Sequence, residues 1–263
     1  MVINPRYKSN HGAEIIFYRE KEFYRNGRGK EMNLKDIRIT HHLYNNPLSD
    51  KSCVHGFHME GMAAVTFSNN AMQMENIVDP NIGQKANFVL WCPETFPKDI
   101  MIEWDFKPLR EPGLCMLFFA GIGRGGEDLF DPKLNPRNGE YKQYHSGDIN
   151  VFHVSYFRRK NPDERMFHTC NLRKSFGFHL VAQGPDPIPS VEDAALKGFY
   201  KIRLIKIDNE VSFYIEDLHI FTYVDDGIKN GTLLGEGKIG FRQMAPLLAE
   251  YANLNVYKIG RSS

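Results

Sequence analysis

The stretch FYKIRLIKIDNEVSFYIEDLHIFTYVDD, residues 199–226, contains three strand-like runs in quick succession. The first two runs, residues 199–208 and 210–217, are joined tightly at Asp208-Asn209. A short polar break of this kind between two such runs is a strong signal for a β-hairpin. The stretch therefore predicts consecutive strands and indicates an all-β fold class.

Further strand-like runs, separated by turn residues, lie on both sides of this stretch. Residues 99–107, DIMIEWDFK, alternate, with Ile102, Trp104 and Phe106 on one side, as in a half-buried strand. The other runs are residues 62–67, 70–75, 86–92, 113–121, 176–183, 235–244 and 251–259. Residues 191–197 are compatible with a short helix. About a dozen strands without a long amphipathic helix predict a two-sheet antiparallel β-sandwich or jelly roll.

Length and composition indicate one domain. A chain of 263 residues with 42% hydrophobic residues can bury one sizeable core, and all-β sandwiches of this length are commonly a single domain. Residues 1–55 are polar and irregular, with aromatic residues interspersed. We therefore expect residues 1–263 to form a single jelly-roll domain, with residues 1–55 as an irregular N-terminal arm packed on it.

The charge balance excludes some classes of partner. Lys plus Arg number 33 against 32 for Asp plus Glu, so no general field attracts nucleic acid or an anionic membrane. Any recognition of an anion must be local. The sequence as given has neither a signal peptide nor an apolar run of membrane length, which predicts a cytoplasmic or periplasmic protein. The oligomeric state stays open.

The cysteines and histidines do not form a pattern typical of a metal site. Cys53, Cys92, Cys115 and Cys170 lie far apart without a CxxC spacing, which favours buried free thiols. His145-x-x-Asp148 and His55-x-x-His58 are single pairs, too few for zinc. We expect no metal or cofactor in the chemistry, and the sequence leaves open whether calcium stabilises the fold.

Polar and titratable residues are concentrated in residues 144–174, at a density that a strand covering a core does not need. The candidate site residues there are His145, Asp148, Asn150, His153, Tyr156, Arg158, Arg159, His168, Arg173 and Lys174. If residues 147–159 form one strand, Asn150, Tyr156 and Arg158 share the face that we expect to bind the ligand. Ile149, Val151 and Phe157 would face the core, with His153 as a buried histidine.

The long loop 121–139, rich in Gly, Pro and Asn, leads directly into this strand. Loops of that length in compact domains are usually functional or disordered. We expect the loop to form a wall of the binding cleft, and Arg124 is its candidate ligand-binding residue.

Residues 128–160, DLFDPKLNPRNGEYKQYHSGDINVFHVSYFRRK, are similar to the YesU-like family of concanavalin-A-like proteins. Its members are found beside genes for breaking down rhamnogalacturonan and other uronate-containing polysaccharides. The ending, GKIGFRQM followed by YANLNVYKI, also resembles the last strands of concanavalin-A-like jelly rolls. The likeness covers residues 56–259 and implies a concanavalin-A-like jelly roll whose substrate class is carbohydrate.

Three chemistries compete for the central stretch. A glycosidase needs two carboxylates that flank the bond, but this strand carries only Asp148, and a solvated outer face explains Glu103 and Asp105. Metal catalysis lacks a ligand set. Elimination from a uronate needs a cation to neutralise the carboxylate and groups that move protons, and the stretch supplies Arg, His and Tyr for both tasks.

The leading hypothesis is therefore a carbon-oxygen lyase acting on uronate-containing oligosaccharides, by glycosidic cleavage or by dehydration of a terminal uronate. Arg158 would hold the carboxylate, with Arg159 or Arg173 as replacements, because Arg binds a carboxylate with two hydrogen bonds. Tyr156 and a histidine, His145 rather than His168, would share the proton transfers. The alternatives are a non-catalytic protein that binds acidic carbohydrate and, third, a glycoside hydrolase.

Overall fold

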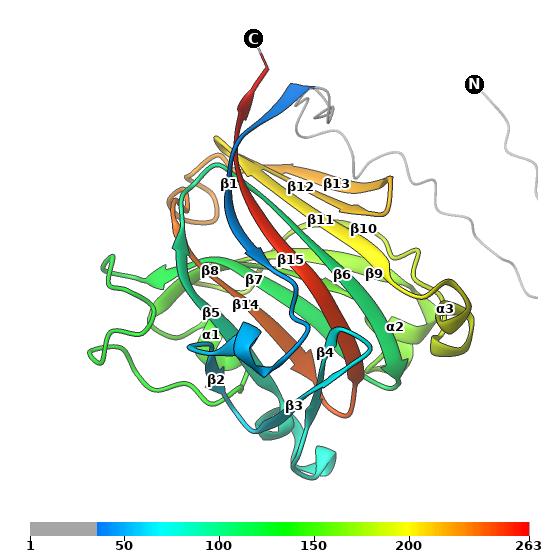
Figure 1. Cartoon of the computed structure of the whole chain (residues 1–263). Helices are drawn as coiled ribbons and strands as arrows, with labels where there is room; N and C mark the ends of the chain where they lie inside the picture. Colours follow the sequence, from blue (N-terminus) through cyan, green and yellow to red (C-terminus); the bar gives the residue numbers. More distant parts are fainter. Residues whose placement is uncertain (1–35, 263) are drawn as a thin grey trace, which may run out of the picture. The chain divides into compact units, whose positions relative to one another are not determined.

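The computed structural model describes residues 36–262, which form two antiparallel β-sheets that pack face to face (Figure 1). In sheet order, the eight-stranded sheet contains β13 (Leu218–Val224), β12 (Glu210–Ile215), β11 (Tyr200–Ile207), β6 (Ile100–Arg110), β15 (Leu248–Arg261), β4 (Ala71–Asn76) and β3 (Ala63–Ser68), with β1 (Ile37–Asn46) paired to β15. The seven-stranded sheet contains β10 (His179–Pro185), β9 (Thr169–Ser175), β8 (Ile149–Tyr156), β7 (Leu114–Gly123), β14 (Gly237–Met244), β5 (Phe88–Phe96) and β2 (His58–Glu60). The predicted two-sheet jelly roll is confirmed.

Helices are short and lie in the connections. They are η2 (Lys51–Val54), η3 (Pro80–Ala86), α1 (Lys142–His145), α2 (Pro162–Met166) and α3 (Val191–Lys197). The bounds of α3 are those predicted for the helix-compatible segment. The predicted hairpin also forms, because Asp208 adopts a φ of 52° and turns β11 directly into β12.

The main core lies between the sheets. Alternation along β6 places Ile102, Trp104 and Phe106 in this core with no exposed surface, while Glu103 and Asp105 lie on the opposite, half-buried face. Glu103 pairs with Arg203 at 2.6 Å there. These two carboxylates therefore belong to the outer face of the eight-stranded sheet, as the sequence predicted.

A second hydrophobic cluster covers the outer face of the seven-stranded sheet, the face turned away from the eight-stranded sheet. Strand residues Trp91, Phe118 and Val151 pack there under Leu129 and Tyr144 from the connection between β7 and β8. This connection is therefore a packed layer on the sheet.

The carboxylate of Glu60, which is 3% exposed, holds this layer in place. It accepts hydrogen bonds from Nε1 of Trp91 at 2.9 Å, Oη of Tyr144 at 2.8 Å and Nε of Arg137 at 2.9 Å. Arg137 also donates to the carbonyl of Leu129 at 2.8 Å. The buried Glu60 carboxylate therefore links the sheet to both ends of the covering layer, to Leu129 through Arg137 and directly to Tyr144.

Residues 1–35 of the N-terminal arm that was expected over residues 1–55 lie outside the described residues. Its remaining part differs from the expectation, because β1 pairs with β15 from Ile37 to Asn46 and η2 follows. Cys92, Cys115 and Cys170 are buried free thiols, as predicted, and Cys53 is a half-buried free thiol. No helix within residues 36–262 is long and apolar enough to cross a membrane.

Candidate functional site

The two faces of β8 are reversed relative to the sequence prediction. Phe152, Val154 and Tyr156 point into the main core, and Tyr156 is fully buried with its hydroxyl accepting a hydrogen bond from Nε1 of Trp104 at 3.0 Å. Burial raises the pKa of Tyr156 well above its ordinary value. Phe157 adopts a φ of 46°, which ends the alternation and directs its own ring into the core as well. Tyr156 therefore has no exposed surface with which to meet a ligand.

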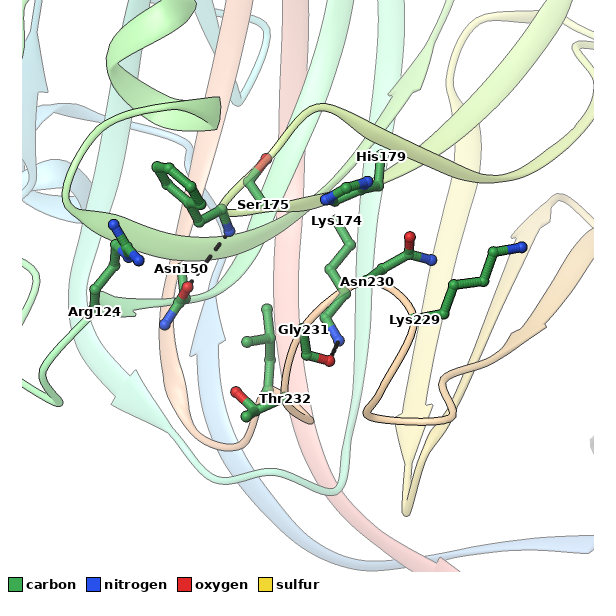
Figure 2. A pocket seen from close by; sticks show the side chains of 11 residues that line it. Arg124, Asn150, Lys174, Ser175, His179, Lys229, Asn230, Gly231 and Thr232 are labelled. Carbon is green, nitrogen blue, oxygen red and sulfur yellow. Dashed lines mark hydrogen bonds between the residues drawn. The ribbon is translucent and has the colours of Figure 1, made fainter.

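Three predicted ligand-binding residues, Arg124, Asn150 and Lys174, come together at a pocket of about 370 Å³ beside the turn between β9 and β10 (Figure 2). The remaining lining residues are Ser175, Phe176, His179, Lys229, Asn230, Gly231, Thr232 and Leu234. Lys174 is already neutralised, because its ammonium lies 2.7 Å from the Asp225 carboxylate and donates to the Gly231 carbonyl at 2.8 Å.

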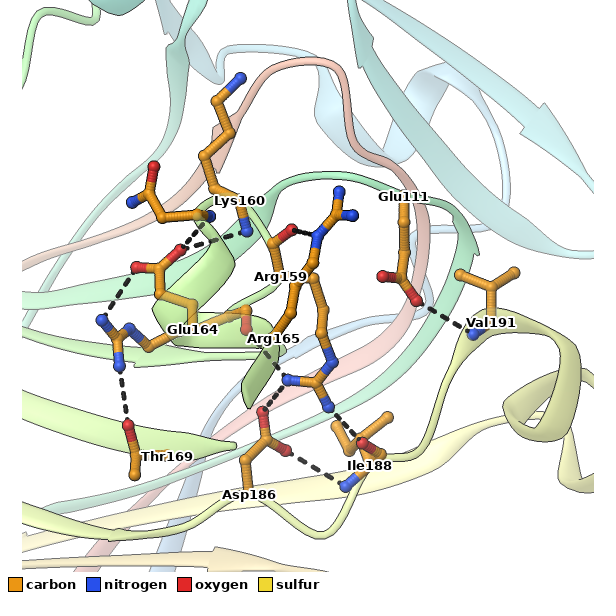
Figure 3. Close-up of polar contacts among 11 residues, drawn as sticks. Glu111, Arg159, Lys160, Glu164, Arg165, Thr169, Asp186, Ile188 and Val191 are labelled. Carbon is orange, nitrogen blue, oxygen red and sulfur yellow. Dashed lines mark hydrogen bonds and ion pairs between the residues drawn. The ribbon is translucent and has the colours of Figure 1, made fainter. Parts of the chain in front are cut away.

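The two arginines that follow β8 hold loops together, and Figure 3 labels Arg159 with its partners Asp186 and Ile188. Arg158 donates to Glu164 at 2.8 Å and to Oγ1 of Thr169 at 2.7 Å. Arg159 is 2% exposed, lies 3.4 Å from the Asp186 carboxylate and donates to the Ile188 carbonyl at 2.6 Å. Because both charges are paired with carboxylates, neither arginine is free to hold the carboxylate of a substrate.

Two further predicted residues, Asp148 and His168, do not share a ligand-binding face with the other candidates. Asp148 fixes the covering layer, since its Oδ2 accepts from the backbone N–H of Asn135 at 2.6 Å and from Nδ2 of the same residue at 2.9 Å. His168 is exposed and precedes β9, five residues before Arg173, which corresponds to about 16 Å along a strand. His168 is thus remote from the other candidates on this sheet.

The remaining candidates, His145, His153 and Arg173, gather on the outer face of the seven-stranded sheet. Strand register places Phe118, His153 and Arg173 side by side on β7, β8 and β9. In the neighbouring row of the same face, Arg242 on β14 lies beside Met116 on β7. His153 is only 1% exposed, because its ring on the outer face lies under the covering layer.

Tyr141, just before α1, completes this group. Its hydroxyl and Nε2 of His153 share a hydrogen bond of 2.5 Å. Its ring lies 5.0 Å from that of His145 and 5.4 Å from that of Phe178, measured between centroids. We call Tyr141, His145, His153, Arg173 and Arg242 the outer-face cluster.

The cluster contains two arginines that have no carboxylate partner among residues 36–262. Arg242 is fully buried, donates to the carbonyl of Gly139 at 3.1 Å, and has its guanidinium carbon 4.8 Å from the centre of the Tyr141 ring. Its Nε has no hydrogen-bond partner within the described part of the chain. Arg173 is half-buried, donates to the carbonyl of Phe178 at 3.2 Å and stacks on the Phe178 ring at 3.9 Å.

These surroundings set the protonation of the cluster. Burial, helped by the charges of Arg173 and Arg242, holds the pKa of His153 well below 6.5. Burial and Arg173 also lower the pKa of His145. Burial raises the pKa of Tyr141 to about 12, although Arg242 and Arg173 act in the opposite direction. At neutral pH the cluster therefore offers two neutral imidazoles and a protonated phenol between two permanent cations.

Tyr141 and Arg242 were not singled out from the sequence. Both lie in segments that were used as markers of the fold, Tyr141 in the covering connection and Arg242 in GKIGFRQM. The available signal was the position of Arg242, which alternates with the core residues Ile239 and Phe241 in the middle of the strand. A charged residue in the middle of such a strand is unusual when both faces are covered.

Within residues 36–262, no three His, Cys, Asp or Glu side chains come together to form a metal site. The expectation that no metal takes part in the chemistry remains a prediction.

Comparison with known proteins identifies relatives over most of the chain. The family model described as "Domain of unknown function (DUF1961)" matches residues 41–256. The uncharacterized protein YesU of Bacillus subtilis (strain 168) is 52% identical over 219 residues, which cover 83% of this chain and 96% of YesU.

Solved structures agree with this relationship. A crystal structure of a protein of unknown function with a galectin-like fold from Bacillus subtilis matches with a TM-score of 0.82 and 50% identity, over 86% of this chain and 100% of that one. Lectin I-B4 from Griffonia simplicifolia matches with a TM-score of 0.53 and 10% identity, over 82% and 98% of the two chains, and this likeness shows the fold alone. The YesU-like resemblance is confirmed, and the chain belongs to the DUF1961 family.

Proposed function

We propose that the protein is a carbon-oxygen lyase that acts on uronate-containing oligosaccharides at the outer-face cluster. The observation that carries the proposal is the pair of arginines, without carboxylate partners in residues 36–262, on either side of the Tyr141–His153 hydrogen bond. A cation near a uronate carboxylate stabilises the negative charge that develops when the neighbouring C–H bond breaks. The lectin that shares this fold is named for sugar binding, so the ligand class that we propose is a carbohydrate.

Arg173 is the residue that we assign to the substrate carboxylate. It is half-buried and stacked on the partly exposed ring of Phe178, so its position is fixed while part of it remains accessible. A guanidinium can bind a carboxylate through two parallel hydrogen bonds. Arg242 is buried and cannot touch a ligand, so its role is to set the electrostatic field around Tyr141.

Protonation assigns the remaining roles. His145 has a lowered pKa and is neutral at neutral pH, which fits a base that removes the proton next to the carboxylate. Tyr141, with a pKa of about 12, is protonated and fits the acid that protonates the departing oxygen. The electrons of the broken C–H bond form the new carbon-carbon double bond as the carbon-oxygen bond breaks. His153 positions the Tyr141 hydroxyl through their hydrogen bond.

After the step, His145 releases its proton to water and Tyr141 regains one, so the cluster returns to its starting state. The departing group can be a sugar, which gives chain cleavage, or water, which gives dehydration of a terminal uronate. The proton chemistry is the same in both cases.

A non-catalytic protein that binds acidic carbohydrate is the second candidate. It is favoured by the pocket, which is lined by Arg124, Lys174 and Lys229 and lies beside the cluster rather than on it. A glycoside hydrolase is less well supported, because it needs two carboxylates at the bond and the outer-face cluster contains none.

The test is a screen of acidic oligosaccharides followed by ultraviolet absorbance. Elimination creates a double bond conjugated with the carboxylate and raises the absorbance, whereas binding and hydrolysis do not. Binding without any absorbance change for every oligosaccharide bound would replace the lyase by the binding protein. A new reducing end without absorbance would indicate hydrolysis.

A further inference from the structure

The pocket beside the turn between β9 and β10 is cationic (Figure 2). Its lining includes Arg124, Lys174 and Lys229 but neither Asp nor Glu. Arg124 and Lys229 lie at opposite sides of the view in Figure 2, with Asn150 and Thr232 between them. A volume of about 370 Å³ is within the range of small-molecule sites. The lining predicts that a ligand of this pocket carries negative charge.

Two of these cationic side chains form no ion pair among residues 36–262, although Asp226 is close enough to Lys229 to interact with it electrostatically. Arg124 and Lys229 have no ion-pair partner in the described part of the chain, in contrast to Lys174 with its Asp225 carboxylate at 2.7 Å. The neighbouring Asp226 accepts from the backbone N–H groups of Ile228 and Lys229, both at 2.9 Å. Arg124 is held in place by stacking, with its guanidinium carbon 3.9 Å from the centre of the Phe176 ring.

The pocket also lies close to the outer-face cluster. Ser175 follows Arg173 by two residues on β9, which corresponds to about 7 Å along the strand. The backbone N–H of Gly177, in the turn that separates the two regions, donates to the carbonyl of His145 at 2.8 Å and so fixes the turn to the cluster. Arg173 and His153 lie on the outer face of the sheet, whereas Lys174 lies on the opposite face with Phe152, so a sugar chain that reaches both regions has to pass around the turn.

We infer that this pocket is a second subsite, which binds the anionic group of the sugar that adjoins the reacting uronate. The inference rests on the proposed function. It defines the substrate class more narrowly, as an oligosaccharide with at least two negatively charged sugars. A single uronic acid would occupy only the cluster.

The test measures binding by titration calorimetry in a Tyr141→Phe background, so that no probe is consumed. The probes are galacturonate, a tetrasaccharide of four galacturonate units, and a chondroitin sulfate tetrasaccharide. We expect one or both tetrasaccharides to bind more tightly than galacturonate. Arg124→Ala and Lys229→Ala should each weaken the binding of that tetrasaccharide about tenfold, the loss expected for a hydrogen bond to a charged group, without changing that of galacturonate.

Lys201→Ala is the matched control, because Lys201 is an exposed lysine on β11 of the other sheet and should leave all affinities unchanged. Preference for the galacturonate tetrasaccharide would assign the pocket to a carboxylate, and preference for chondroitin sulfate would assign it to a sulfate ester. The inference is overturned if neither tetrasaccharide binds more tightly than galacturonate, or if both pocket variants bind like Lys201→Ala. If a tetrasaccharide binds but the unsubstituted protein causes no absorbance change, the proposed lyase activity is wrong, whereas the second subsite stands.

Discussion

Oη of Tyr141 lies 2.5 Å from Nε2 of His153 on the outer face of the seven-stranded sheet. His153 is 1% exposed, whereas Tyr141 is only partly buried, so Tyr141 is the member of the pair that a ligand can touch. Its pKa of about 12 keeps the hydroxyl protonated near neutral pH. The pair thus couples a protonated phenol on a partly exposed residue to a buried, neutral imidazole.

Tyr141→Phe should abolish most turnover while the fold stays intact. The ring and its packing remain, but the variant cannot donate a proton, and loss of a general acid typically costs about 10²–10⁴-fold in rate. The measurement is the rate of absorbance increase on a substrate found in the screen. Tyr257→Phe is the control, since Tyr257 lies on β15 of the other sheet and should keep normal turnover. Equal rates for the two variants would remove Tyr141 from the chemistry.

Arg173→Ala should weaken binding of an acidic oligosaccharide by about 1.5–3 kcal/mol, the range for hydrogen bonds to charged groups. A carboxyl-reduced, neutral analogue should bind equally well to both proteins, because it has no charge for Arg173 to pair with. Arg203→Ala removes an arginine that is paired with Glu103 on the other sheet and should affect neither ligand. If Arg173→Ala weakens both ligands equally, Arg173 supports the structure instead of holding the carboxylate.

Local patterns in the sequence predicted most of the fold. Alternation in residues 99–107, the break at Asp208-Asn209 and the helical segment 191–197 all appear in the structure as predicted. Alternation could not orient β8, because a covering layer makes both of its faces largely apolar. The position of Tyr156 relative to Arg158 also depended on a single backbone angle at Phe157, φ 46°, which side-chain periodicity does not reveal.

The candidate site was harder to predict because its members are distant in sequence. Arg242 reaches Tyr141 through the pairing of β14 with β7, a contact between residues about a hundred positions apart. Whether Arg158 and Arg159 were free depended on their partners Glu164, six residues from Arg158 in the next helix, and Asp186, which the tertiary structure brings near. The sequence did point to His145, His153 and Arg173, because all three lie in the polar stretch 144–174, part of which forms the outer face of the sheet.

Tyr156→Phe distinguishes the site predicted from the sequence from the site proposed from the structure. The substitution leaves the indole N–H of Trp104 buried without its acceptor, which should cost about 1–3 kcal/mol of stability. Turnover per folded molecule should remain normal, since Tyr156 faces the core. Unfolding in denaturant gives the first quantity and the absorbance assay gives the second. A large loss of turnover with unchanged stability would restore Tyr156 as the catalytic tyrosine.

His153 should make the protein less stable in mild acid. Its pKa is well below 6.5 in the folded protein and about 6.5 in the unfolded chain, so below pH 6.5 the unfolded chain binds the extra proton. Its contribution to stability is complete above pH 6.5. It declines by up to about 1.4 kcal/mol per pH unit as the pH falls toward the folded pKa.

The measurement for His153 is the free energy of unfolding at several pH values between 5 and 7, compared with that of His153→Gln. The glutamine cannot titrate, so the difference between the two proteins isolates the histidine. We expect the slope of stability against pH to be shallower in the variant. Equal slopes of stability against pH in the two proteins would mean that His153 takes up its proton as readily in the folded protein as in the unfolded chain.

Glu60→Gln should destabilise the covering layer that carries Tyr141. Glu60 is 3% exposed and its carboxylate lies 2.9 Å from the Arg137 guanidinium, which is also buried. The glutamine keeps the volume but leaves Arg137 without its countercharge, a change that typically costs about 3–5 kcal/mol. For a domain of this size that corresponds to a fall in Tm of roughly 6–20 °C. Glu216→Gln is the control, because its pair with Lys197 at 3.0 Å is exposed and contributes about 1 kcal/mol or less. Thermal unfolding of the two variants checks the difference, and a similar Tm for both would show that the Glu60–Arg137 pair does not fasten the layer to the sheet.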